Sequence, residues 1–501
     1  MYSLANTVIR IYRRSPQSVL DMILLACVYI TYCAFAITKI PNILIPPESS
    51  DPHMFSLIAD IIREKGLMLK EFPVYFFSPL YAYFNYLLKL VTPNSVMLVR
   101  TLIVLQCVLF FVSIRYFKKI VEILVDERAG RLGMFLYGLY PPFIFYSVIP
   151  IKDIVTVSLM VIAMFYLLRF VESKKTVLCI LIGLLTGCMI HLRGTVALLV
   201  PVVIVCICIV SSWRVAVLFL ACVSVCILPF TLRNYLVCKE FVLLTPISGI
   251  HSYIGNNKDA TGVYIHVNNV RSSSFGHFFD ARKIAHRQTG EKLNARQTNA
   301  YWKKQAWNYI TGHPWSALRL YLKKLLLLIH YKEIPSNYFF EQFKLDYPLF
   351  GLFNVPYNMG VLTILAALGF MGTRIRFKPW LLVFMAVFAT GTIIGFVVGR
   401  YRLPLAIFLL IGVTGFIQSI RTKTFQPDIK KIAVAVALCF ATWFPSIGDE
   451  QAFFSKARDQ AKQSQRLIEK FRDQGYNDYE LWRRRKNIMY VRSYTRQQFL
   501  K

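Results

Sequence analysis

Seven charged residues stand at the ends of long apolar runs, where an ionised side chain is costly unless it is paired or used. Two are acidic and five are basic: Asp51, Asp153, Lys152, Arg193, Arg233, Arg400 and Arg402. A carboxylate in such a position can take a proton from a hydroxyl group. Lys and Arg side chains can bind a phosphate through charge-assisted hydrogen bonds. The set therefore indicates a site that combines a general base with phosphate binding.

Each of these residues also has a plainer structural interpretation. A lone Lys or Arg at a helix end can extend to the membrane surface and anchor the helix. Asp51 precedes Pro52, and Asp-Pro is a common helix start in which the Asp is the N-cap. Asp153 can form an ion pair with a neighbouring Arg. For five basic residues on one face we favour a shared function, and for Asp51 both roles are compatible.

Apolar helices must position these residues. Hydrophobic residues make up 56% of the 501-residue chain and charged residues 17%, against about 25% charged in soluble domains. Many apolar runs approach the roughly 20 residues that span a bilayer. We expect about eleven spans, at 18–46, 97–116, 132–150, 154–171, 177–192, 194–211, 214–231, 355–373, 379–398, 403–420 and 431–446. The predicted fold is an all-α polytopic membrane protein, with an interfacial helix at 75–91.

Lys and Arg in the loops predict the sidedness of the spans, because cytoplasmic loops carry an excess of these residues. With the N-terminus inside, all seven charged residues face outward, as do three long segments. We therefore expect four parts: an N-terminal transmembrane module 1–231 with an outer loop 47–96, an extracytoplasmic domain 232–354, C-terminal transmembrane helices 355–446, and a charged helical tail 447–501.

The domain 232–354 combines two kinds of pattern. Short β-rich stretches such as 262–265 alternate with turn residues, and 293–330 follows an amphipathic helical pattern. The domain is therefore expected to be mixed α/β or mainly helical. The stretch Gly255-Asn256-Asn257 lacks the P-loop pattern and is expected to be a turn with positive φ.

Composition excludes several function classes. The net charge of +32 is explained by loops that meet anionic headgroups, and no basic, aromatic-interleaved module predicts nucleic-acid binding. Ten of the eleven Cys lie in apolar runs and no C-x-x-C occurs, so we expect neither a disulfide framework nor structural zinc. His53, His191 and His251 have no metal-ligand spacing between them, so no metal is expected.

Several motifs resemble the GT-C glycosyltransferases, in particular bacterial relatives of the dolichyl-phosphate-mannose–protein mannosyltransferases and the lipid A aminoarabinose transferases. The motifs occur in family order between residues 51 and 404. They are Asp51 with Phe55 and Ala59, Ser78-Pro79-Leu80-Tyr81, Arg233-Asn234-Tyr235, Gly255-Asn256-Asn257 with Ala260-Thr261-Gly262, the segment 306–314 followed by Lys323-Lys324, and Arg400-Tyr401-Arg402-Leu403-Pro404.

The resemblance implies an inverting transfer of a sugar from a polyprenyl-phosphate donor to a glycan, lipid or protein hydroxyl at the outer face of a bacterial inner membrane. Asp51 would be the general base, and Asp153 would be a second acidic residue of the catalytic site. Lys152, Arg193, Arg233, Arg400 and Arg402 would bind the donor phosphate, and His53, Tyr81, Asn256 and Asn257 are candidate substrate contacts. No cofactor is implied. Many relatives carry Asp-Glu or Asp-Ser in the first loop, whereas this chain has Asp51-Pro52-His53.

Two other functions stay open. A lipid-linked glycan flippase or transporter would also need many helices and basic residues, but is expected to carry charges near the bilayer midplane or repeat symmetry. The spans of this chain are nearly free of mid-helix charge. An inactive assembly factor is the other alternative, and the presence of Asp51 favours an enzyme over it.

Overall fold

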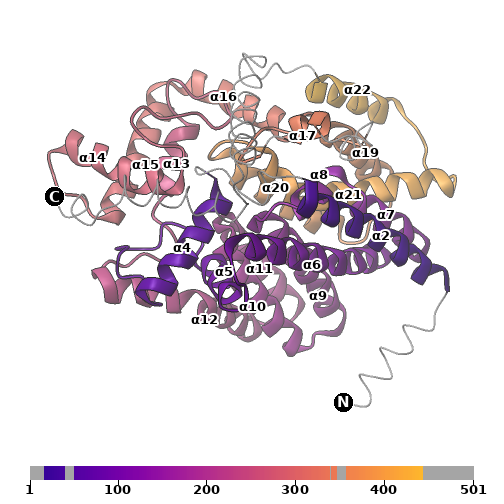
Figure 1. Cartoon of the computed structure of the whole chain (residues 1–501). Helices are drawn as coiled ribbons and strands as arrows, with labels where there is room; N and C mark the ends of the chain where they lie inside the picture. Colours follow the sequence, from indigo (N-terminus) through magenta and orange to yellow (C-terminus); the bar gives the residue numbers. More distant parts are fainter. Residues whose placement is uncertain (1–15, 40–49, 339, 347–356, 444–501) are drawn as a thin grey trace.

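The computed structural model describes residues 16–39, 50–338, 340–346 and 357–443. Within these ranges the protein is an assembly of α-helices without a β-strand (Figure 1). The predicted all-α architecture is therefore confirmed for the described part of the chain. The β-rich stretch at 262–265 forms only an isolated bridge between Val263 and Val397, so the mixed α/β alternative for 232–354 is wrong there.

Five described helices are long and apolar enough to cross a membrane. They are α2 (Pro16–Lys39), α6 (Ser95–Leu124), α9 (Lys152–Ser173), α12 (Trp213–Cys238) and α21 (Gly399–Arg421). Shorter apolar helices accompany them: α10 (Thr176–Leu192), the 3-10 helix η1 (Gly194–Leu199) leading into α11 (Val200–Val210), α19 (Met359–Gly372) and α20 (Lys378–Ile393). The last predicted span corresponds to α22 (Ile429–Trp443).

The single span predicted at 132–150 is wrong. The chain forms two short helices there, α7 (Glu127–Gly138) and α8 (Pro141–Ser147). Pro141 and Pro142 lack backbone N–H groups, so they cannot continue a helix but can begin one. Residues 75–91 contain the short helix α5 (Pro79–Val91), which exposes Leu87, Leu90 and Val91 along one side.

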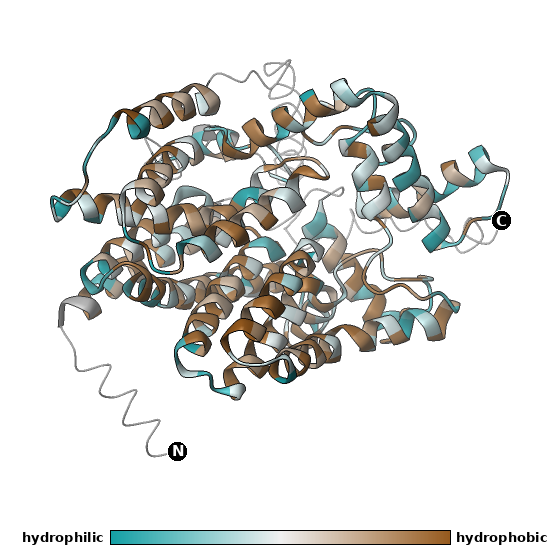
Figure 2. Cartoon of the chain, turned by 180° about the vertical axis from the view of Figure 1, so that it is seen from behind, coloured by the Kyte–Doolittle hydropathy of each residue, from teal (hydrophilic) through white to brown (hydrophobic). Residues whose placement is uncertain are grey.

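The more polar helices gather at one end of the molecule. They include α4 (Asp51–Lys65), α14 (Ala281–Thr289) and α15 (Ala295–Gly312). Further helices are α13 (Ser248–Gly255), the π-helical turn η2 (Gly276–Asp280), α16 (Pro314–Ile329) and α17 (Phe340–Asp346), the last of which packs on Phe145 of α8. Figure 1 places α4, α13, α14 and α15 together at its left end. Figure 2 shows more hydrophilic residues on α14 and α15 than along the bundle. The tail 447–501 lies outside the described residues.

Aromatic packing joins the segment between α4 and α5 to the later polar helices. The Phe76 ring stacks on Phe278 with centroids 4.9 Å apart, and Phe72 and Phe76 both meet Phe275. All four rings are buried. The segment before α5 is therefore held against η2, and this contact brings α4 close to residues from 232–354.

Close packing on α12 fixes the position of the C-terminal half of α10. A Cβ atom added at Gly183 would lie 2.6 Å from Cys222 Cβ and 2.8 Å from the Phe219 carbonyl oxygen. One added at Gly187 would lie 2.6 Å from Cys226 Cβ. Small residues four apart allow two membrane helices to approach in this way. The pairing holds the C-terminus of α10, where the chain turns towards α9 and α21.

The substitution Gly183→Ala is expected to destabilise the bundle, because the new methyl group overpacks the contact between α10 and α12, at a cost of about 1–3 kcal/mol. Thermal unfolding in detergent, followed by tryptophan fluorescence, measures the change. Gly312→Ala is the matched control, since nothing lies within 4 Å of its added Cβ. Equal melting temperatures for the two variants would contradict the close approach.

Candidate active site

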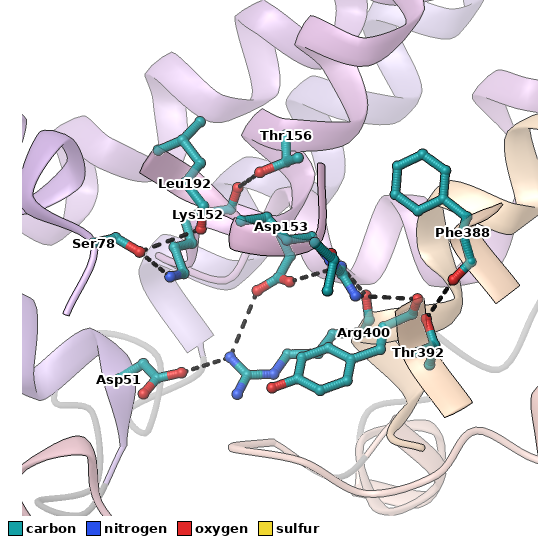
Figure 3. Close-up of polar contacts among 12 residues, drawn as sticks. Asp51, Ser78, Lys152, Asp153, Thr156, Leu192, Phe388, Thr392 and Arg400 are labelled. Carbon is teal, nitrogen blue, oxygen red and sulfur yellow. Dashed lines mark hydrogen bonds and ion pairs between the residues drawn. The ribbon is translucent and has the colours of Figure 1, made fainter. Parts of the chain in front are cut away.

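Five of the seven charged residues meet at one place (Figure 3). Asp51 lies in the first turn of α4, Lys152 and Asp153 begin α9, Arg193 follows α10, and Arg400 lies in the first turn of α21. The two carboxylates therefore lie at helix N-termini, where the helix dipole stabilises negative charge. The ends of four segments that are distant in sequence form the site.

Arg400 bridges the two carboxylates. Its Nη1 atom lies 2.6 Å from Asp51 Oδ2 and 3.6 Å from Asp153 Oδ2. The other oxygen of Asp153 lies 3.4 Å from Nη1 of Arg193. Arg193 also donates to the backbone carbonyls of Arg400 and Tyr401, each at 3.2 Å. Asp153 and Arg193 together therefore hold Arg400 in place.

Lys152 completes the positive side of the site. Its ammonium group donates to the Ser78 hydroxyl, which in turn donates to the Leu192 carbonyl at 3.2 Å. The same ammonium group lies 5.5 Å from the centre of the Phe55 ring. These contacts place Lys152 among α4, the start of α5 and the end of α10, and none of these contacts is with an anion.

Asp51 is ionised at neutral pH. Burial alone would raise the pKa of Asp51, but the charges of Arg400 and Lys152, with hydrogen bonds from Arg400 and Asn337, lower it from 3.8 to about 2. Because the folded-state pKa is depressed, the stabilisation is fully present above pH 3.8 and is lost as the pH falls towards 2. Asp51 is the first helical residue of α4, and Ser50 rather than Asp51 is the N-cap, accepting from the His53 backbone N–H. Because Ser50 caps the helix, the Asp51 carboxylate pairs with Arg400 instead.

Arg233 has a different environment from the cluster. It donates to the backbone carbonyls of Met68, Leu69, Phe72 and Pro73, and its guanidinium lies 4.4 Å from the centre of the Tyr75 ring. The loop between α4 and α5 wraps around this one side chain. The contacts of Arg233 therefore give it a structural role in shaping the loop.

Arg402 is also held by backbone. It is 1% exposed and donates to the carbonyls of Leu327, His330 and Lys332, with Glu333 Oε1 2.9 Å from its Nη2. These bonds join the end of α16 to the start of α21. Of the five predicted phosphate-binding residues, the structure brings together Lys152, Arg193 and Arg400, whereas Arg233 and Arg402 bind backbone carbonyls.

The other predicted substrate contacts in the first loop are His53 and Tyr81. His53 is buried in α4, two residues after Asp51. The Tyr81 hydroxyl donates to Gln106 Oε1 at 3.0 Å, and its ring meets Phe55 edge to face. Tyr81 therefore supports the face of α4 that carries Phe55.

Asn256 and Asn257 follow α13, and their side-chain amides bond to carbonyl oxygens of its last turns. Asn256 donates to the carbonyls of Ser252 and Ile394 and accepts from Lys324, while Asn257 donates to the Tyr253 carbonyl. The predicted positive-φ turn at Gly255-Asn256-Asn257 is wrong: Asn256 has φ −143°. Gly255 is required because its backbone packs directly on that of Gly395. The positive φ in this region belongs to Gly262, at 94°.

Three side chains that were not predicted as site residues form a hydrogen-bonded chain beside the cluster. His251 Nε2 lies 3.2 Å from His277 Nδ1, and His277 Nε2 lies 3.1 Å from the Tyr264 hydroxyl. No short sequence pattern predicts such a pair, because the two histidines are 26 residues apart. Within the described ranges, no three His, Cys, Asp or Glu residues are grouped so as to hold a metal ion.

The fold and site define a helical membrane protein with a charged site at one end of its helices. No protein-family model and no curated protein matches the sequence. Solved structures of the oligosaccharyltransferase of Archaeoglobus fulgidus are similar to the chain. The complex with Zn and sulfate has 14% identity and a TM-score of 0.44, over 83% of this chain and 51% of that one.

Two further structures of the same archaeal protein show the same level of similarity. The apo form has 13% identity and a TM-score of 0.42, over 83% of this chain and 54% of that one. The complex with an inhibitory peptide and a dolichol-phosphate has 13% identity and a TM-score of 0.41, over 82% and 54%. The chain thus spans about half the length of these structures. Similarity at this level does not assign the chain to a family.

The substitution Asp153→Asn is expected to destabilise the protein by about 3–5 kcal/mol. It removes the carboxylate partner of the nearly buried Arg193 guanidinium and leaves Arg400 with Asp51 alone. Asp428→Asn removes the pair between the exposed Asp428 and Lys431 and is the control, with a much smaller expected loss because water screens the charge. Melting temperatures in one detergent compare them. Similar losses in the two variants would contradict the buried network.

Proposed function

We propose that this chain is an integral-membrane glycosyltransferase that moves a sugar from a polyprenyl-phosphate donor to an acceptor hydroxyl, with inversion at the anomeric carbon. The observation that carries the proposal is the ionised Asp51 beside Lys152, Arg193 and Arg400 at the ends of apolar helices. Such a site suits a substrate whose phosphate lies at the membrane surface while its apolar tail stays in lipid. The motifs that resemble GT-C transferases support the same function.

In the proposed reaction the acceptor oxygen forms a bond to C1 of the sugar as the bond from C1 to the phosphate oxygen breaks. The phosphate leaves with the electron pair, and the proton of the acceptor hydroxyl passes to Asp51. Lys152, Arg193 and Arg400 stabilise the charge that develops on the departing phosphate. The reaction is balanced without an oxidant or a reductant.

Arg400 links donor binding to the base. Arg400 contacts Asp51 and holds the pKa of that carboxyl low. A donor phosphate competes with Asp51 for the same guanidinium. As Arg400 turns to the phosphate, the pKa of Asp51 rises and the carboxylate becomes a better proton acceptor. Donor binding therefore prepares Asp51 for the acceptor.

The four-part organisation predicted from the sequence fits this function. We propose that residues 232–354 cover the site on the extracytoplasmic side and select the acceptor, while 1–231 and 355–446 form the membrane body. The resemblance to GT-C transferases implies a bacterial inner membrane. Neither a metal nor another cofactor has an assigned role in the proposed reaction.

The proposal is tested by incubating the purified protein with a panel of polyprenyl-phosphate sugars and following donor loss by mass spectrometry. Asp51→Asn is expected to lower donor consumption about 100-fold or more, since an amide cannot accept the proton. Asp259→Asn, at an exposed position, is the control and is expected to retain activity.

Two outcomes would contradict the transferase. Equal donor consumption by wild type and Asp51→Asn would remove Asp51 from the reaction. Binding of a lipid-linked oligosaccharide without consumption of any donor would favour a flippase or an assembly factor. The melting temperature of each variant separates a loss of chemistry from a loss of folding.

Lys152→Gln tests the phosphate-binding role separately. Loss of one cation from the donor phosphate is expected to raise the donor KM about tenfold, which corresponds to about 1.4 kcal/mol, and to leave the acceptor KM within twofold. Steady-state kinetics in which the donor concentration and the acceptor concentration are varied in turn give the two constants. Lys258→Gln is the control on an exposed lysine, and a donor KM that rises equally in both variants would contradict the assignment.

A further inference from the structure

The hydrogen-bonded chain Tyr264–His277–His251 comes from three segments of 232–354. His251 lies on α13, His277 on η2, and Tyr264 in the extended segment that precedes η2. The three residues are each partly exposed, so an incoming molecule can reach them. Their polar atoms form two hydrogen bonds with each other, at 3.2 and 3.1 Å.

Ring contacts connect this chain to the charged site. The Phe396 ring meets the rings of His251, Tyr264 and Tyr401, with centroids 5.3–5.9 Å apart. Tyr401 in turn lies under the guanidinium groups of Arg193 and Arg400. The charge of Asp51 acts on both histidines. The histidine pair and Asp51 therefore belong to one site.

The histidine pair is electrically neutral near pH 7. Burial and the neighbouring His277 lower the pKa of His251 to about 3, although the charge of Asp51 opposes the shift. Burial lowers the pKa of His277 to about 4 against the charges of Asp51 and Asp280. A neutral imidazole has one hydrogen-bond donor and one acceptor. The internal hydrogen bonds use both nitrogens of His277 and Nε2 of His251, so Nδ1 of the neutral His251 is the imidazole nitrogen that remains for a hydroxyl group.

We propose that His251, His277 and Tyr264 form the acceptor subsite, which binds an uncharged saccharide by its hydroxyl groups and positions one of them beside Asp51. This inference rests on the proposed function. A hydroxyl both donates and accepts, as a neutral imidazole does, and the apolar ring of Phe396 provides a surface for the C–H face of a sugar. Because Lys152, Arg193 and Arg400 serve the donor phosphate in the proposed reaction, the uncharged histidine pair is left to bind the hydroxyl groups of the acceptor.

The inference is tested with His251→Phe and His277→Phe, which keep an aromatic ring but remove the polar atoms, and with His277→Gln, which restores a donor and an acceptor. In assays with neutral tetrasaccharides of glucose, mannose and N-acetylglucosamine, the Phe variants are expected to raise the acceptor KM about tenfold or more. The donor KM is expected to change by less than twofold, and His277→Gln to recover part of the loss. His313→Phe is the control, at an exposed histidine.

Direct binding of the same tetrasaccharides to the full chain without donor makes the result independent of catalysis. Weaker binding by the Phe variants and by tetragalacturonate, an anionic counterpart, supports the subsite. If wild type binds the neutral saccharides but consumes no donor, the transferase proposal fails while the saccharide site stands. The subsite is overturned if wild type binds no neutral saccharide, if the Phe variants bind as wild type does, or if donor and acceptor KM rise together.

Discussion

Arg400 bound between Asp51 and Asp153 is the contact on which the arrangement of the site depends. Ionised groups at helix ends in an apolar protein are costly unless opposite charges meet. That requirement forces the starts of α4, α9 and α21 to lie together, because each carries one of the three residues. Arg193 adds the end of α10 to the same point and binds the backbone at the start of α21.

The same residue type has two roles in this protein. Arg400 and Arg193 contact carboxylates, and a phosphate could compete for their guanidinium groups. Arg233 donates to four backbone carbonyls, and Arg402 donates to three and also pairs with Glu333, so these two arginines hold loops and helix ends. A guanidinium has five N–H donors, which allows one side chain to satisfy several carbonyls that would otherwise be buried without partners. The scaffold around the site therefore depends on arginine as much as the proposed chemistry does.

The segments that pack around α4 contribute the uncharged residues near Asp51. Aromatic packing of the α4–α5 loop on η2 brings His277 into the region of α4. The turn before α21 adds Phe396, and the first turn of α21 adds Tyr401. The resulting site has a cationic group suited to phosphate and a neutral hydrogen-bonding group suited to hydroxyls. Asp51 acts electrostatically on both, as the proposed transfer from a phosphate to a hydroxyl requires.

Composition and the length of apolar runs were sufficient to predict a helical membrane protein, because hydropathy and helix-start signals such as Asp51-Pro52 act over short distances in sequence. They also predicted which charged residues lie at helix ends. They did not predict that α7 and α8 divide one apolar run, since two adjacent prolines interrupt it without a change in hydropathy. Only the tertiary structure decided which residues meet. Asp51 and Arg400 are 349 residues apart, and the packing of helices, rather than any local pattern, brings Arg400 to Asp51, His251 to His277, and Arg233 and Arg402 to backbone carbonyls.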